Sequence, residues 1–318
     1  MRKALVIGID YYDHVTPLHG CVNDSYNVKA VLERNSDGSV NFDVKHFPVN
    51  DPDSSLSRSE LKAQVAELFR GDSEVALFYF SGHGYVENSG GYLITTDSKN
   101  GDEGLQLEEI LRLANESQAR NKILILDSCH SGALGSVAAL GSAAVIEEGV
   151  TILSASGKDQ YALEVGGSGV FTTLFVDAMQ GGAADLMGHV TPGSVYAHID
   201  QSLGPWEQRP VFKTNVKNFT ALRRVTPPIP TEDLRKITTL FEHPSAEFAL
   251  NPSFEPEGDH QKDPVNMANF KILQAYNRVN LVIPVSTTHM YHAAMESRSC
   301  RLTALGAHYW NLVQRGRI

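Results

Sequence analysis

The chain has few cysteines and no long apolar run. Only three of its 318 residues are cysteine, an odd number, and they are scattered at positions 21, 129 and 300. This argues against a disulfide framework and favours a reducing compartment. No apolar stretch approaches the roughly 18 residues of a membrane span, and no signal segment follows Met1. We therefore expect a cytoplasmic protein that does not contact a membrane.

Basic residues are also scarce. Lys and Arg number 27 against 37 Asp and Glu, which gives a formal net charge of −10. With 42% apolar and 20% charged residues, the composition is that of an ordinary soluble globular protein. A chain of 318 residues is long enough for one large domain and a smaller second one.

Segments typical of strands and helices alternate along the first two thirds of the chain. Apolar runs typical of strands cover residues 4–9, 40–46, 75–80, 122–126, 150–154 and 211–213. Helical periodicity covers residues 23–33, 59–69, 108–115 and 172–180. Ser57 or Ser59 can cap the second of these helices. The alternation predicts an α/β fold with a mostly parallel sheet covered by helices.

Two of the strand-like runs end in small-residue turns that carry a nucleophile and a base. One continues into residues 127–132 (DSCHSG), and the other into residues 81–84 (SGHG). A thiol attacks only as the thiolate, so it needs a neighbouring base. Parallel strands that end side by side would bring Cys129 and His83 to one rim of the sheet. This predicts a cysteine hydrolase in which the N–H groups of Gly84 and Cys129 hold the oxyanion.

Each of these residues also has a purely structural interpretation. A single Cys is most often a small core residue, and a His after a strand often only ends the strand. Glycines lie in both turns, Gly82 and Gly84 beside His83 and Gly132 after Cys129, and they let the backbone approach a ligand closely, which favours catalysis. His130 is a rival base by proximity, but neighbouring side chains on a turn rarely meet in hydrogen-bond geometry. The adjacent Cys and His also make a zinc site a poor prediction.

Other stretches follow in a recognisable order. They are ALVIGIDYY at 4–12, LHGCVND at 18–24, SAS at 154–156, GVFT at 169–172 and QRPVF at 208–212. With the two turns, they resemble the caspase-like cysteine peptidases, specifically the metacaspase and bacterial branch. The resemblance covers residues 1–220 and implies a caspase-like fold with a six-stranded sheet and the site at the strands' carboxyl ends. The stretch around Cys129 departs from the Gln-Ala-Cys-x-Gly of true caspases.

The resemblance also implies a substrate pocket. Metacaspases line the S1 pocket with acids and cut after Arg or Lys, and the matching positions here are Cys21, Asp24, Ser81 and Asp127. Two carboxylates in one cleft suit a guanidinium and repel an aspartate substrate. Asp24 could instead cap a helix, and Asp127 could instead orient the histidine or cap the following turn.

Several metacaspases use calcium, as the resemblance implies. Asp97, Asp102 and Glu103 form a loose acidic stretch, but hard cations need about six or more oxygens in a defined cage. The spacing shows no such cage, so we expect a solvated loop, no metal site and no required cofactor.

The composition changes after residue 225. Seven of the 14 prolines lie between residues 225 and 264, which predicts a proline-rich linker at 226–264 with a short helix at 231–241. Residues 265–318 carry six basic residues and one acid, a formal charge of +5, against −15 for residues 1–264. Expected helices at 266–279, 289–295 and 304–314, with the short segment 299–302, weakly resemble a winged-helix domain. The charge difference suggests a module that has its own partner or that docks on the acidic domain. Winged helices bind DNA or proteins, and positive charge alone does not select between them. Because the basic clusters are sparse, we expect a regulatory protein rather than a nucleic acid as the partner.

The sequence thus predicts a cysteine endopeptidase that cuts after Arg or Lys and is regulated by a partner, a ligand or proteolysis. The alternative is a catalytically silent or regulatory caspase-like adaptor whose C-terminal domain binds protein or DNA. We would expect such an adaptor to lack the Cys, the His or the pocket acids. Residues 130–157 contain no Lys or Arg, so self-cleavage is expected in or beside the linker. The basic residues there are Arg223, Arg224, Arg235, Lys236 and Lys262.

Overall fold

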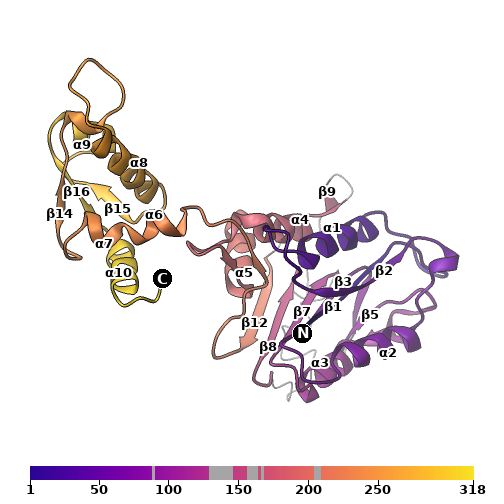
Figure 1. Cartoon of the computed structure of the whole chain (residues 1–318). Coiled ribbons are helices and arrows are strands. Elements are labelled where there is room, and N and C mark those ends of the chain that lie inside the picture. The colour runs from indigo at the N-terminus through magenta and orange to yellow at the C-terminus, as the bar shows by residue number, and fades with distance from the viewer. Residues whose placement is uncertain (88–89, 129–145, 156–163, 166–167, 204–208) are drawn as a thin grey trace. The chain divides into compact units, whose positions relative to one another are not determined.

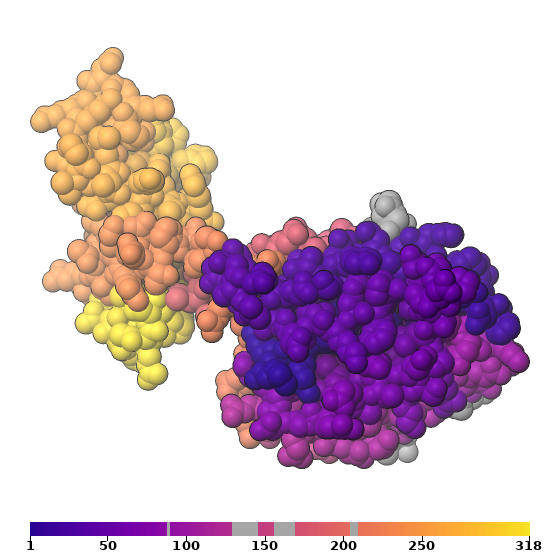
Figure 2. Space-filling view, turned by 45° about the vertical axis from the view of Figure 1, so that its right-hand side comes forward, coloured from indigo at the N-terminus to yellow at the C-terminus, as the bar shows by residue number. Residues whose placement is uncertain are grey.

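The computed structural model describes residues 1–87, 90–128, 146–155, 164–165, 168–203 and 209–318. The chain divides into two compact units, Met1–Thr226 and Pro227–Ile318 (Figure 1). Residues from the N-terminal third of the chain form much of the face of the first unit in Figure 2. The predicted nucleophile Cys129 and its neighbour His130 lie outside the described residues.

The first unit is built on a six-stranded sheet with the order β12-β8-β7-β3-β1-β2. The strands are β1 (Arg2–Ile9), β2 (Asp43–Val49), β3 (Val75–Ser81), β7 (Asn121–Asp127), β8 (Val150–Ser154) and β12 (Val211–Asn215). All neighbours pair in parallel except β12, which runs antiparallel to β8. Strand β3 is buried along its whole length, as expected where helices cover both faces. The predicted fold, mostly parallel and six-stranded, is confirmed.

Helices cover both faces of this sheet. They are α1 (Cys21–Glu33), α2 (Arg58–Leu68), α3 (Leu107–Glu116), α4 (Val170–Asp177) and α5 (Pro192–Ser202). Apolar residues of α2 and α3 belong to one core cluster, and those of α1, α4 and α5 to the other. Along β1, Leu5, Ile7 and Ile9 enter the first cluster while Ala4 and Val6 enter the second. Figure 1 shows α2 and α3 on one side of the sheet and α1 and α4 on the other.

Side-chain caps fix where α2 begins. The Ser57 side chain accepts a hydrogen bond from the Glu60 amide, and the Glu60 carboxylate accepts one from the Ser57 amide. This reciprocal pair satisfies two amide groups that the helix itself leaves unbonded. Of the two serines predicted as caps, Ser57 is the one confirmed.

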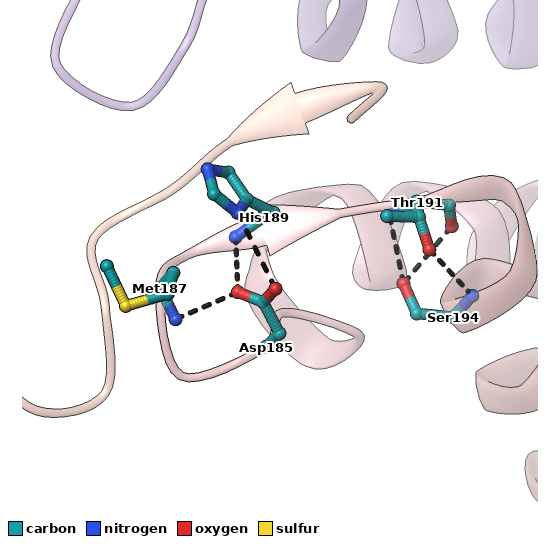
Figure 3. Close-up of polar contacts among 5 residues, drawn as sticks. All are labelled: Asp185, Met187, His189, Thr191 and Ser194. Atoms are coloured by element: carbon teal, nitrogen blue, oxygen red, sulfur yellow. Dashed lines mark hydrogen bonds and ion pairs between the residues drawn. The ribbon is translucent and has the colours of Figure 1, made fainter. Parts of the chain in front are cut away.

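The segment before α5 is held by similar local bonds (Figure 3). The Asp185 carboxylate accepts hydrogen bonds from the amides of Met187 and His189, each 2.8 Å long. Thr191 and Ser194 then exchange bonds at the start of α5. Between them lies β11 (His189–Val190), which pairs with β13 (Arg223–Arg224) and ties the end of the first unit to its body.

Several elements differ from the sequence prediction. The second strand begins at Asp43 rather than residue 40, and α4 ends at Asp177 before a π turn, Ala178–Gly182, in which Gly181 has a φ of 132°. Sequence patterns missed α5 and the small sheet of β4 (Gly84–Glu87), β5 (Gly90–Leu93) and β6 (Leu105–Gln106). They also missed the paired strands β9 (Glu164–Val165) and β10 (Ser168–Gly169), and the 3-10 turns η1 (Pro52–Ser54) and η2 (Gly101–Glu103).

The second unit has a small antiparallel sheet, in the order β14-β16-β15, with helices around it. Its elements are α6 (Thr231–Arg235), α7 (Ile237–Leu240), β14 (Glu247–Ala249), η6 (Pro252–Phe254), α8 (Pro264–Arg278), β15 (Val282–Pro284), α9 (Met290–Met295), β16 (Ser299–Leu302) and α10 (Ala304–Gln314). The predicted segments at 266–279, 289–295, 299–302 and 304–314 are therefore present, and the winged-helix resemblance stays a prediction. No helix in the described parts of either unit is long and apolar enough to cross a membrane.

The prediction of a linker at residues 226–264 is wrong. These residues pack into the second unit, where the Trp310 indole donates a 2.7 Å hydrogen bond to the Phe241 carbonyl and the rings of Phe254 and Phe270 lie 6.3 Å apart. Two of the prolines in this region begin helical turns, Pro252 in η6 and Pro264 in α8, rather than holding an extended chain.

The prediction of a basic C-terminal module at residues 265–318 is also wrong, because the second unit begins at Pro227 rather than at residue 265. From Pro227 onward the chain holds nine acidic and nine basic residues, so the second unit has no formal net charge. The acids that the linker prediction had separated from the basic tail belong to the same unit. Charge therefore gives this unit no reason to dock on the acidic first unit or on a nucleic acid.

Candidate active site

The carboxyl ends of β1, β3 and β7 lie next to each other and bring four predicted pocket residues together. Ser81 at the end of β3 is in register with Asp127 at the end of β7. Cys21 begins α1, and Asp24 lies in its first turn. All four residues are buried. The sequence prediction that these positions share one site therefore agrees with their placement.

The environment of Cys21 shows how strongly this site is acidic. Burial raises the pKa of the Cys21 thiol, while a hydrogen bond with Ser81 lowers it. Three neighbouring carboxylates raise the pKa further, those of Asp10, Asp127 and Asp24. The thiol stays protonated at neutral pH, so Cys21 is not a second nucleophile.

The two pocket acids meet at the N-terminus of α4. The Gly169 amide donates a 3.0 Å hydrogen bond to Asp24 Oδ2, and the Thr172 hydroxyl donates a 2.6 Å bond to Asp127 Oδ2. A methyl group on Gly169 would lie 2.6 Å from Asp127 Oδ2 and 3.2 Å from Asp24 Oδ2. Two carboxylates this close repel each other, and a cation placed between them relieves the repulsion.

The interpretation of Asp24 as a helix cap is wrong. Helix α1 begins at Cys21, three residues earlier than Asp24, and the residue before the helix is Gly20. The capping role belongs to Asp10, whose carboxylate accepts hydrogen bonds from the amides of Cys21 (2.9 Å) and Val22 (3.4 Å). Sequence reasoning missed Asp10, although an acid placed directly after a buried strand was a signal for it.

His83 follows β3 at the same edge and is held at both ends. Its main-chain amide donates a 2.8 Å hydrogen bond to the Tyr12 hydroxyl, and the two rings lie 4.9 Å apart. Its Nε2 lies 2.8 Å from the Thr16 carbonyl oxygen. A carbonyl only accepts hydrogen bonds, so Nε2 carries the proton and Nδ1 is the basic nitrogen of the neutral ring. The orientation of the ring thus needs no carboxylate, which removes the reason to assign that role to Asp127.

Steric crowding explains why the residue before His83 is a glycine. A methyl group on Gly82 would lie 2.8 Å from the Tyr12 hydroxyl oxygen and 2.9 Å from the ring of Phe80. Sequence reasoning missed Tyr12, which is buried, and the carbonyl of Thr16, which leaves no mark in a sequence. Gly84, the predicted oxyanion residue, is half-buried at the start of β4 and pairs with Leu93.

The acidic stretch considered for calcium has other partners. Asp97 Oδ1 accepts hydrogen bonds from the Thr95 hydroxyl and the Arg58 amide. Backbone amides at Lys99 and Asn100 donate to the Glu103 carboxylate and hold its pKa below the usual range, although slight burial opposes this. Within the described ranges, no group of three or more His, Cys, Asp or Glu side chains is arranged to hold a metal ion.

Comparisons with known proteins identify the family of the first unit. Residues 1–220 match the peptidase C14 family, described as the caspase domain. Metacaspase-1 of Mycosarcoma maydis is 29% identical over 143 residues, which cover 41% of this chain and 36% of that protein. Metacaspase-1A of Neurospora crassa is 30% identical over 158 residues, covering 42% and 32% respectively. The chain thus spans about a third of the length of these relatives.

Solved structures show the same fold at low sequence identity. A protein from Geobacter sulfurreducens aligns with a TM-score of 0.52 and 17% identity, over 71% of this chain and all (100%) of that chain. Caspase-1 from Spodoptera frugiperda aligns with a TM-score of 0.52 and 13% identity, over 71% and 91%. These likenesses confirm the predicted caspase-like architecture.

Proposed function

The chain belongs to the caspase-domain peptidase family, and from this premise we propose that it is a cysteine endopeptidase that cuts after Arg or Lys. The observation that carries the proposal is the meeting of two buried carboxylates, those of Asp24 and Asp127, at Gly169. A guanidinium can take bidentate hydrogen bonds from such acids. An aspartate side chain entering the same pocket would meet like charge, which selects against it.

In the proposed reaction His83 accepts the thiol proton of Cys129 through Nδ1, which the Thr16 carbonyl leaves as its basic nitrogen. The thiolate attacks the carbonyl carbon, and the N–H groups of Gly84 and Cys129 stabilise the oxyanion. The C–N bond breaks as the imidazolium returns its proton to the leaving amine. Water then hydrolyses the thioester and regenerates the thiol.

Regulation by proteolysis is part of the proposal, and the surroundings of the basic residues favour some cleavage positions over others. Arg223 donates hydrogen bonds to the carbonyls of Arg34 and Met179, which hold its segment in place. Lys262 lies in the exposed segment between η6 and α8, outside any helix or strand. Exposed irregular backbone is cut most readily, so Lys262 is the favoured site for self-cleavage. The second unit remains a proposed site for a regulatory protein.

The test is hydrolysis of peptides ending in Arg, Lys or Asp by the purified protein, with and without calcium. Cleavage after Arg and Lys that is lost in Cys129→Ala would support the proposal. Asp24→Asn and Asp127→Asn should each lower kcat/KM for the Arg peptide by about 10- to 100-fold, since a hydrogen bond to a charged group contributes about 1.5–3 kcal/mol. Asp53→Asn, an exposed acid in η1, is the matched control.

Two results would contradict this reading of the site. Cleavage after Asp would refute the acidic pocket while leaving the catalytic pair intact. No cleavage of any peptide, with or without calcium, would favour the adaptor that binds without cutting.

A further inference from the structure

A chain of buried hydroxyl groups leads from the central sheet to the pocket acids. The Tyr79 hydroxyl lies 2.6 Å from Thr172 Oγ1, which in turn lies 2.6 Å from Asp127 Oδ2. Tyr79 is fully buried in β3, and Thr172 is 1% exposed in the first turn of α4. The three side chains come from β3, α4 and β7, so the chain forms only when the sheet and α4 pack together.

The direction of these hydrogen bonds follows from the donors available. The Thr172 hydroxyl has one hydrogen and donates it to the Asp127 carboxylate, so Tyr79 must be the donor to Thr172. Burial raises the pKa of Tyr79, and the charges of Asp127 and Asp24 raise it further. The phenol therefore keeps its proton, and both hydroxyls point their hydrogens toward the pocket.

The second pocket acid is held by the same turn of α4. The Gly169 amide donates to Asp24 Oδ2, and Gly169 precedes Thr172 by three residues, so both donors lie on one face at the start of the helix. The partial positive charge of a helix N-terminus also favours the ionised form of nearby carboxylates. One helical turn thus supplies a donor to each acid.

We propose that Thr172, with Tyr79 behind it, is a positioning residue that keeps Asp127 ionised and fixed in orientation, and so sets a preference for Arg over Lys. This inference rests on the proposed function and adds a specificity determinant to it. Asp24 stands close by, and two adjacent carboxylates tend to share a proton or turn apart unless donors hold them. The planar guanidinium of Arg needs carboxylates in fixed orientations, whereas the Lys ammonium is a point charge that tolerates rotation.

The test compares Thr172→Val, Thr172→Ser and a matched control. Thr151→Val is the control, because Thr151 is also buried and bonds to another hydroxyl, that of Thr214, at 2.8 Å in the sheet. We expect Thr172→Val to raise KM for an Arg peptide about tenfold and KM for a Lys peptide less than about threefold. Thr172→Ser should restore both, and the control should change neither.

A pH profile gives a second readout that a merely structural role would not move. Losing a donor to a carboxylate disfavours its ionised form, so the acid limb of kcat/KM should shift to higher pH in Thr172→Val and not in Thr151→Val. Among the described residues, the other ionisable groups around this site include Asp24 and Cys21 on α1, Asp10 after β1, Tyr79 on β3 and His83 just after β3. All of them are unchanged in both variants.

The outcomes separate this inference from the proposed function. If the wild-type protein cleaves basic peptides but Thr172→Val behaves like Thr151→Val, the inference is wrong and the proposed function stands. If the wild type cleaves no basic peptide, the proposed function fails. The inference is then tested by the affinity for benzamidine, measured by calorimetry on Cys129→Ala protein with and without Thr172→Val. About tenfold weaker binding after adding Thr172→Val supports it, and equal binding or none overturns it.

A folding defect in Thr172→Val would be seen as a melting temperature far below that of Thr151→Val. In that case Tyr79→Phe carries the test, because it keeps the Thr172 hydroxyl and removes only the donor behind it. We expect about threefold weaker recognition of Arg, by KM or by benzamidine affinity. Recognition equal to that of the wild type would refute the inference.

Discussion

Replacing Gly169 by alanine tests whether the two pocket acids meet where the structure places them. The backbone there has φ −65° and ψ 134°, which any residue adopts, so the effect of an added methyl group is steric alone. That methyl group would lie 2.6 Å from Asp127 Oδ2, which forces a shift, and 3.2 Å from Asp24 Oδ2, which is slightly closer than ordinary van der Waals contact. Both side chains are buried and have little room to move.

Overpacking a buried site costs about 1–3 kcal/mol of unfolding free energy. For a unit of this size each kcal/mol lowers the melting temperature by about 2–4 °C, so we expect a fall of about 4–8 °C at the middle of that range. The effect on Arg recognition should be larger, because moving both acids weakens charged contacts of about 1.5–3 kcal/mol each. We expect kcat/KM for an Arg peptide to fall by about 100-fold or more.

The assays are thermal unfolding and peptide hydrolysis, with Gly193→Ala as the matched control. Gly193 lies in the first turn of α5, where the nearest atoms to an added methyl group belong to the Phe219 ring, at 3.0 Å. That ring is exposed and can shift, unlike the two buried carboxylates at Gly169. Alanine favours a helix over glycine by about 0.5–1 kcal/mol, so this control should unfold at the same or a higher temperature and keep full activity. A Gly169→Ala protein with wild-type stability and activity would refute the claim that both carboxylates converge on this position.

Three other substitutions probe other parts of the structure. Tyr12→Phe removes the acceptor for the His83 amide. It should lower the free energy of unfolding, measured by chemical denaturation, by about 1–3 kcal/mol, and it should lower kcat. An unchanged kcat would show that this bond does not position the ring. Ser57→Ala removes the side-chain cap of α2. It should lower the free energy of unfolding by about 1 kcal/mol and leave kcat/KM unchanged. A loss of activity would mean that α2 contributes to the site. Tyr276→Phe removes a hydrogen bond to the Asp233 carbonyl and should lower the stability of the second unit by about 1 kcal/mol. Faster hydrogen exchange in α6 would reveal this loss, and unchanged exchange would argue that α6 is held by other contacts.

The sequence was sufficient to predict the sheet, and the edge where β3 and β7 end, because their signals are local. The strands that flank the site, β3 and β7, contain short continuous apolar runs, which are typical of strands buried on both faces of a sheet. The residues at their ends, Ser81 and Asp127, then fall at one edge by topology alone. Placing Cys21 and Asp24 beside them needed the family resemblance, since nothing local tells where α1 begins relative to the pocket.

The features that could not be predicted depend on contacts between distant residues. The bond between Thr172 and Asp127 joins positions 45 apart in the chain, and each residue alone is common in a helix or at a strand end. Prolines were misleading in the second unit, because a proline that starts a helix and one in a linker look alike in composition. Pro264 takes the first of these roles, and the error moved a domain boundary and with it the apparent charge of the tail.

The carbonyl of Thr16 that orients His83 has a consequence for evolution and for mutagenesis. Every amino acid carries a main-chain carbonyl, so no substitution at position 16 can delete this acceptor, and drift at that position leaves it in place. Insertions and deletions between β1 and α1 are different, because they would move the carbonyl away from the ring. Selection should therefore constrain the length of that loop more tightly than the identity of residue 16, and alanine scanning would pass over one of the groups that matter most.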